Sequence, residues 1–266
     1  MNNTKFYIFS LTSFISVIIL RCIQILFLIE PKTGFFKYEL ETLGTLTTFL
    51  VIAVSVFTAF LGFIHKDITV KNLNRYSSFV GACAIFMGIA HLVEPFTTAL
   101  DSSAVPLYMR ILKIFFIILT GFVLVYFGFC RLTRRHFAPA LFVVPIFTWV
   151  IRLMSTFISF NGMSYISENL FDILMLCSVL LFMLFYGKSM CRIRQKYCSR
   201  LTLAFGIAAV FFTSASVIPS TIISLTGSMT LYHTTLDNHS TCIFTAVFIL
   251  SVVLSLVGVM KKSEKV

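Results

Sequence analysis

The chain has 266 residues, of which 58% are apolar and 12% are charged, and its formal net charge is +11. A soluble domain carries roughly a quarter charged residues, so this composition excludes an ordinary water-soluble protein and predicts a membrane protein. The positive charge does not indicate nucleic-acid binding, because the basic residues border apolar segments, where anionic lipid attracts each of them by about 1 kcal/mol.

Eight apolar stretches are long enough to cross a bilayer, which takes about 20 residues per helix. In chain order the predicted spans are Phe6–Ile29, Leu43–Ile64, Phe79–Leu100, Leu107–Cys130, Phe137–Phe160, Leu170–Tyr186, Leu201–Leu225 and Cys242–Met260. The sixth is the shortest, and we expect it to begin nearer Ile166. Inside hydrocarbon only a helix pairs all backbone groups within one segment. The predicted fold is therefore all-α: a polytopic helical bundle of eight transmembrane helices, forming one domain over residues 1–266.

Lys and Arg gather in every second gap between the predicted spans. These gaps and the two chain ends hold most of the 21 basic residues, whereas the opposite gaps hold only Lys32 and Lys37 and carry most of the acidic residues. Basic residues close to membrane segments are retained in the cytoplasm. We therefore predict a multi-pass protein of the plasma membrane with both termini cytoplasmic.

One charge spacing occurs twice, between Arg21 and Glu41 and between Arg152 and Asp172. Four helices before the loop at Arg131 and four after it would begin on the same side. This is the arrangement of parallel repeats around an axis along the membrane normal. The spacing suggests the hypothesis that residues 1–130 and 131–266 are two repeats, in each of which an Arg is clamped to a carboxylate on the next helix.

Ionisable residues at membrane depth are energetically costly and tend to mark functional sites. Here they are predicted to lie at one level, in the half of the bundle that faces the outside. The predicted substrate-binding or intramembrane polar cluster consists of Arg21, Gln24, Glu41, His91, Glu94, Arg110, Lys113, Arg152 and Asp172.

The third predicted span shows which way these groups point. One helical face carries, at alternating steps of three and four, the residues Gly81, Ala84, Gly88, His91 and Pro95. Small residues on such a face let another helix approach closely, so His91 is expected to face the bundle. The short connection that follows makes the fourth span an antiparallel neighbour, and Glu94 is expected to pair with Arg110 or Lys113.

Two interpretations of the charges remain open. Charged side chains near helix ends often extend to the interface and only anchor or clamp the helices. Alternatively the charges line an outward-facing cavity. The seventh span favours a cavity or a mobile element, because its outer half contains Pro219 among several Ser and Thr residues. The same hydroxyls could equally serve helix packing.

Enzyme and metal motifs are absent from the sequence. It contains no HExxH motif, nucleophile elbow or glycine-rich phosphate loop. His233, Asp237 and His239 are too loosely spaced to indicate a metal site. We expect no cofactor, no metal and no catalytic residue, and an enzyme would have to rely on His91 and Glu94 as an acid–base pair.

The first predicted outer turn reads Glu30, Pro31, Lys32, Thr33, Gly34, Phe35 and Phe36, in which Pro presets the turn and Gly closes it. Together with Arg21 and Gln24 just before it, this run resembles uncharacterised multi-pass membrane proteins of Gram-positive anaerobic bacteria. The resemblance covers only the N-terminal part of the chain. It implies a bacterial plasma membrane location and no particular activity.

The leading functional prediction is transport or binding of a small solute through an outward-facing polar cavity. The alternative is a non-transporting membrane subunit or sensor that binds a protein partner, with the intramembrane charges acting as structural clamps. The expected partners are the lipid bilayer, a small solute and other membrane subunits, and not nucleic acid.

Overall fold

The computed structural model describes residues 3–30, 35–64, 77–98, 106–160, 167–191, 197–226 and 236–257. These residues form helices and contain no strand beyond a single bridge between Ile29 and Phe36. The long helices are α1 (Asn3–Ile23), α2 (Glu41–Ile64), α4 (Ser78–Thr98), α5 (Leu107–Leu132), α6 (Val143–Phe160), α7 (Ser167–Met190), α8 (Cys198–Thr226) and α9 (Leu236–Val257). Eight helices of the described chain are long and apolar enough to cross a membrane, which confirms the predicted all-α fold and its eight candidate spans.

Short segments of π-helix or 3₁₀ helix adjoin one end of three of the helices. The π-turn η1 (Gln24–Leu28) continues α1, the 3₁₀ turn η2 (Tyr38–Leu40) leads into α2, and η3 (Pro139–Phe142) leads into α6. Helix α9 begins several residues before the predicted start at Cys242, in a polar segment that includes Asp237.

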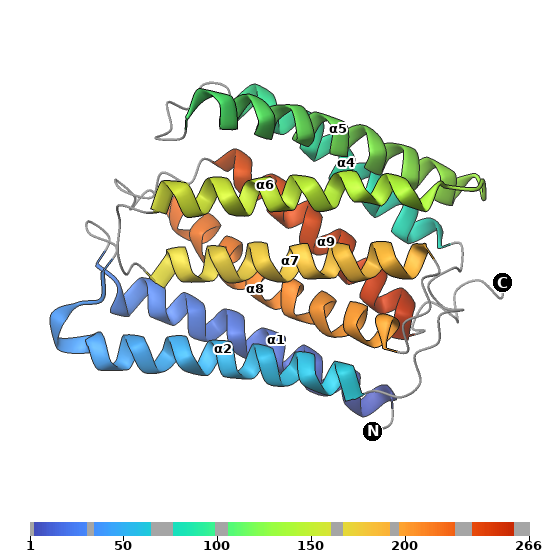
Figure 1. Ribbon diagram of the computed structural model, residues 1–266. Coiled ribbons are helices and arrows are strands. Elements are labelled where there is room, and N and C mark those ends of the chain that lie inside the picture. The colour runs from blue at the N-terminus through green and yellow to red at the C-terminus, as the bar shows by residue number, and fades with distance from the viewer. Residues whose placement is uncertain are drawn as a thin grey trace.

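The N-terminal half of the bundle is divided into two hairpins. Helices α1 and α2 pack together on one side of the bundle, α4 and α5 pack together on the other, and α6 to α9 lie between them (Figure 1). Helix α8 packs against α1, α2, α7 and α9, and its span is the most buried of the eight. The chain therefore encloses one central helix rather than forming two separate four-helix units.

Apolar and charged side chains are distributed as in a membrane protein. Large apolar side chains such as Phe49, Phe96 and Phe115 are exposed on the outside of the bundle, whereas Arg21 and Glu94 are buried within it. Water would favour the reverse arrangement, and hydrocarbon favours this one. Together with the eight apolar helices, this pattern indicates a multi-pass membrane protein.

Opposed glycines hold α4 and α5 in close contact. A Cβ atom added at Gly88 would lie 2.8 Å from the carbonyl oxygen of Gly121, and one added at Gly128 would lie 2.5 Å from the carbonyl oxygen of Gly81. In both cases the obstructing atom belongs to the backbone and cannot rotate away. The small-residue face predicted on the third span therefore packs against α5.

Aromatic rings fill the bundle near the end where α5 and α7 finish. We call this group the aromatic layer. Its rings contact one another with centroid separations of 5.0 to 6.4 Å, mostly edge to face, which is a favoured geometry. The layer consists of Phe127, Phe137, Phe142, Phe182, Tyr186 and Phe248.

The α4–α5 contact predicts a specific sensitivity to added volume. We expect Gly88→Ala to lower the free energy of unfolding by about 1–3 kcal/mol, because the new methyl group forces the two backbones apart. Gly187→Ala is the matched control, since its Cβ would meet its nearest neighbour at 3.4 Å, an ordinary contact distance. Thermal unfolding of the purified protein in detergent measures both. Equal effects of the two substitutions would contradict the proposed close contact.

Candidate functional site

A layer of ionisable side chains, four buried and two half-buried, crosses the other half of the bundle, where α1, α4, α6 and α8 end and α2, α5, α7 and α9 begin. We call it the polar layer. It takes side chains from five of the eight helices, α1, α4, α5, α6 and α7, so it is a feature of the whole bundle and not of one hairpin. Its members are Arg21, His91, Glu94, Lys113, Arg152 and Asp172.

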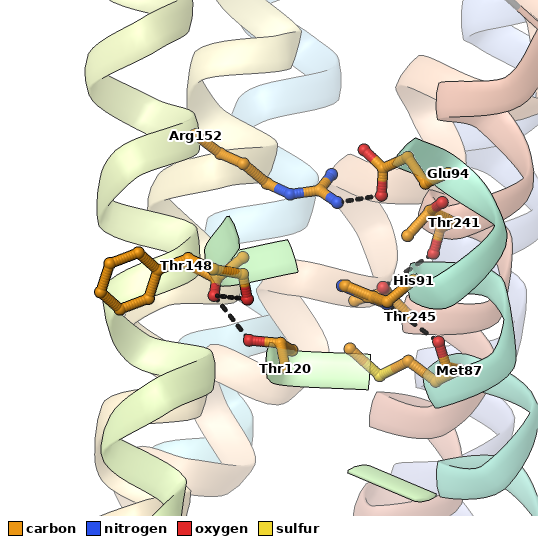
Figure 2. Close-up of polar contacts among 9 residues, drawn as sticks. Met87, His91, Glu94, Thr120, Thr148, Arg152, Thr241 and Thr245 are labelled. Atoms are coloured by element: carbon orange, nitrogen blue, oxygen red, sulfur yellow. Dashed lines mark hydrogen bonds and ion pairs between the residues drawn. The ribbon is translucent and has the colours of Figure 1, made fainter. Parts of the chain in front are cut away.

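The centre of the polar layer is an ion pair between Arg152 on α6 and Glu94 on α4. Arg152 Nη2 donates a hydrogen bond to Glu94 Oε2, and both side chains are buried (Figure 2). The guanidinium carbon of Arg152 also lies 4.9 Å from the centroid of the Trp149 ring. If either charge is removed, the other remains uncompensated in a low-dielectric environment. The contributions of the two residues to stability are therefore strongly coupled.

His91 lies one helical turn before Glu94 and is fully buried. Its Nδ1 is 2.9 Å from the carbonyl oxygen of Met87 (Figure 2). A carbonyl oxygen only accepts hydrogen bonds, so Nδ1 carries a proton and, in the neutral ring, Nε2 presents a lone pair. Among the described residues Nε2 has no hydrogen-bond partner, and the same holds for Nε1 of Trp149, whose ring stands edge-on to His91 at 6.4 Å.

A second buried arginine joins α1 to α2 through an amide. Arg21 Nη1 donates to Gln24 Oε1 at 2.5 Å, and Gln24 Nε2 donates to Thr48 Oγ1 at 2.6 Å and to the carbonyl oxygen of Gly44 at 2.9 Å. Gln24 is the first residue of the π-turn η1. π-turns occur often at functional sites. This one begins three residues after the fully buried Arg21.

The remaining contacts tie Arg21 to α7 and α8. Its Nε donates to the carbonyl oxygen of Ala215 at 3.4 Å, and its guanidinium carbon lies 4.1 Å from the centroid of the Phe171 ring. The neighbouring residues of these two partners also interact, because Ser216 Oγ donates to Asp172 Oδ1 at 2.5 Å. Arg21 and Asp172 thus belong to adjacent contacts at the same level.

Cys242 on α9 is a further buried residue near the groups around Arg152 and Arg21. This buried thiol lies within electrostatic range of Arg152, Glu94, Lys113 and Asp172. Lys113 is likewise within range of Glu94, in keeping with one of the two partners expected for that carboxylate. Cys242 therefore lies within electrostatic range of charged side chains from α4, α5, α6 and α7.

Two predicted clamps are wrong. Arg152 pairs with Glu94 and not with Asp172, whose carboxylate accepts a hydrogen bond from Ser216 instead. Glu41 is exposed at the start of α2, whereas Arg21 is fully buried and bonds to Gln24. In both cases the chosen carboxylate has a similar depth in the membrane, but another group lies closer in the packed bundle. Arg110, also expected in the cluster, is half-buried on α5.

Sequence reasoning missed Trp149, Ser216 and Cys242. Trp149 precedes Arg152 by three residues and so shares its helical face, a signal that the sequence contains. It also missed a hydroxyl contact between α5 and α6, in which Thr120 Oγ1 lies 2.6 Å from Thr148 Oγ1 (Figure 2). The described His, Cys, Asp and Glu residues include no group that could hold a metal ion, and His233 lies outside the described residues.

The buried ion pair predicts a large and partner-specific effect on stability. We expect Glu94→Gln to lower the free energy of unfolding by about 3–5 kcal/mol, because Arg152 becomes an uncompensated buried charge. Glu41→Gln, on an exposed side chain, is the control and should leave the unfolding midpoint unchanged. In a double-mutant cycle Glu94→Gln and Arg152→Gln together should cost less than the sum of the single substitutions. Strict additivity would show that the pair is not formed.

No protein family, curated protein or solved structure matches this chain. A fold hosts many functions, so function has to be argued from the site itself. The candidate site in this protein is the polar layer.

Proposed function

We propose that the protein binds a small solute at the polar layer and transports it across the plasma membrane. The observation that supports this best is the concentration of six buried or half-buried ionisable side chains from five helices at one level, around polar atoms of His91 and Trp149 that have no partner in the described chain. Each ionised group at the bilayer centre costs about 2.5–3.5 kcal/mol or more. Binding of a solute by these groups would explain why the protein contains charged side chains at this cost.

Helix clamping alone explains less of the layer. The bundle already joins α4 to α5 through opposed glycines and α5 to α6 through Thr120 and Thr148. Such contacts hold membrane helices together without burying charge. A purely structural layer would also be expected to satisfy the buried imidazole and indole nitrogens. Clamping by Glu94 and Arg152 is compatible with a binding site, because one pair can do both.

We further propose that the polar layer faces the outside. The support is the distribution of Lys and Arg, which fill the gaps at the opposite end of the helices. The halves 1–130 and 131–266 also remain a predicted duplication, supported by the shared charge spacing. The two arginines use different partners, so any duplicated halves have diverged in their contacts.

The orientation predicts the behaviour of reporter fusions. Fusions after Met190 and after Leu132 should be active only for a cytoplasmic reporter, and a fusion after Phe160 only for an exported reporter. Alkaline phosphatase and green fluorescent protein form a suitable pair. Phosphatase activity after Met190 would place the polar layer at the cytoplasmic side and overturn this orientation.

A second candidate function is a non-transporting sensor or subunit that binds a protein partner. The aromatic layer favours it, because Phe127, Phe142, Tyr186 and Phe248 interlock between the polar layer and the opposite end of the bundle. A transporter needs that barrier to open during its cycle, whereas a sensor can keep it closed.

Two native cysteines distinguish the candidates. Two chains are compared, each of which keeps one native cysteine, Cys242 or Cys191, and has the other six replaced by Ala or Ser. Transport predicts that Cys242 reacts with a membrane-impermeant thiol reagent from both faces of sided vesicles. The sensor predicts reaction from the outside only. Cys191, exposed at the end of α7, is the control and should react only from the cytoplasmic side. A Cys242 that reacts from neither face would contradict solute binding at this layer.

A further inference from the structure

Three buried polar atoms near the Glu94–Arg152 pair have no hydrogen-bond partner among the described residues: Nε2 of His91, Nε1 of Trp149 and Nε of Arg152. Their chemistry is not uniform. The indole and guanidinium nitrogens carry protons and can only donate, whereas Nε2 of the neutral His91 ring can only accept. A complementary ligand therefore has acceptor atoms for the two donors, and Nε2 can take up one proton when the ligand binds.

These side chains are successive neighbours. Arg152 lies over the Trp149 ring at 4.9 Å, and the Trp149 ring meets the His91 ring at 6.4 Å. His91 and Glu94 point from α4 toward α6, and Arg152 points back from α6 toward them (Figure 2). Helices α4 and α6 pack mainly on other helices, α4 on α5 and α9 and α6 on α5 and α7. Side chains thus meet across the space between two helices that are not close neighbours.

The charges around His91 favour a negative ligand. Its own helix contributes Glu94 and α6 contributes Arg152, and Lys113 on α5 lies within electrostatic range of Glu94. Among the α9 side chains that the structure describes, the uncharged residues Thr241, Cys242 and Thr245 lie at this level. Across the whole layer, including Arg21 and Asp172, cationic side chains outnumber carboxylates. At low dielectric this excess attracts an anion and repels a cation.

The donors favour a carboxylate over other anions. A guanidinium and an indole N–H present planar donors, and a carboxylate offers two coplanar oxygen acceptors. Glu94 already occupies Nη2 of Arg152 and leaves Nε. One ligand oxygen can therefore bind Nε of Arg152 or Nε1 of Trp149 while Glu94 stays in place.

We propose, on the basis of the proposed solute-binding function, that the ligand is a small carboxylate held by Arg152, Trp149 and His91, and that it binds together with one proton on Nε2 of His91. The proton comes from outside water and forms an N–H bond at Nε2, because Nδ1 already holds a proton donated to Met87. That N–H then donates to the carboxylate. The added negative charge and the added positive charge cancel, and no bond of the ligand is broken.

The test is ligand binding by the purified protein in detergent, with acetate, lactate, benzoate, phosphate, choline and sorbitol as probes at constant ionic strength. At least one of the carboxylates should raise the unfolding midpoint and slow thiol labelling of Cys242 several-fold, and choline and sorbitol should do neither. Carboxylate affinity should weaken by about tenfold per pH unit above neutrality, because one proton is taken up with the ligand.

His91→Gln keeps a polar side chain of similar size but cannot take up the proton. We expect it to bind the carboxylate more weakly and without pH dependence. His136→Gln, on an exposed histidine at the opposite end of the bundle, is the control and should behave as the unaltered protein. pH dependence that survives in His91→Gln would overturn the role of His91.

The outcomes separate this inference from the proposed function. If Cys242 reacts from outside but is protected only by choline, sorbitol or phosphate, solute binding stands and the carboxylate assignment fails. If no probe has any effect on a reactive Cys242, the carboxylate assignment fails as well. A Cys242 that is unreactive from both faces removes the proposed function itself.

Discussion

The contact between Glu94 and Arg152 is the interaction on which the arrangement of this bundle depends. It joins α4, which belongs to one outer hairpin, to α6, which belongs to the central group of helices. Two buried charges of opposite sign repay their desolvation only when their geometry is good and further groups support them. Here the face of Trp149 supports the guanidinium, and Lys113 and His91 lie within electrostatic range of the carboxylate.

The two halves of the bundle use different means of packing. In one half, charged and hydroxyl side chains from most helices converge, and Gln24 bridges Arg21 to the backbone of α2. In the other half, aromatic rings such as Phe127, Phe142 and Tyr186 interlock. A polar layer beside an apolar aromatic layer is the arrangement on which the proposed solute binding rests.

The helices themselves follow closely from the sequence, because hydrocarbon leaves a long apolar segment no other way to pair its backbone. The inward face of the third span could also be read correctly. Gly81 and Gly88 allow close backbone approach, and His91 at the end of that face is buried. Hydropathy predicted the polar ends of helices less well. Helix α9 begins at Leu236, in a polar segment, and not at the predicted Cys242.

The sequence was not sufficient to predict which buried side chains pair with each other. It determined that Arg21, Glu94, Arg152 and Asp172 lie within helices, because apolar residues flank each of them. It could not determine that Arg152 meets Glu94 or that Arg21 meets Gln24. The depth of a residue along a helix is a local property that its own segment determines. The pairing of two side chains depends instead on which helix faces pack against each other. Only the tertiary structure decides that, through close backbone packing and through side chains that reach across the bundle.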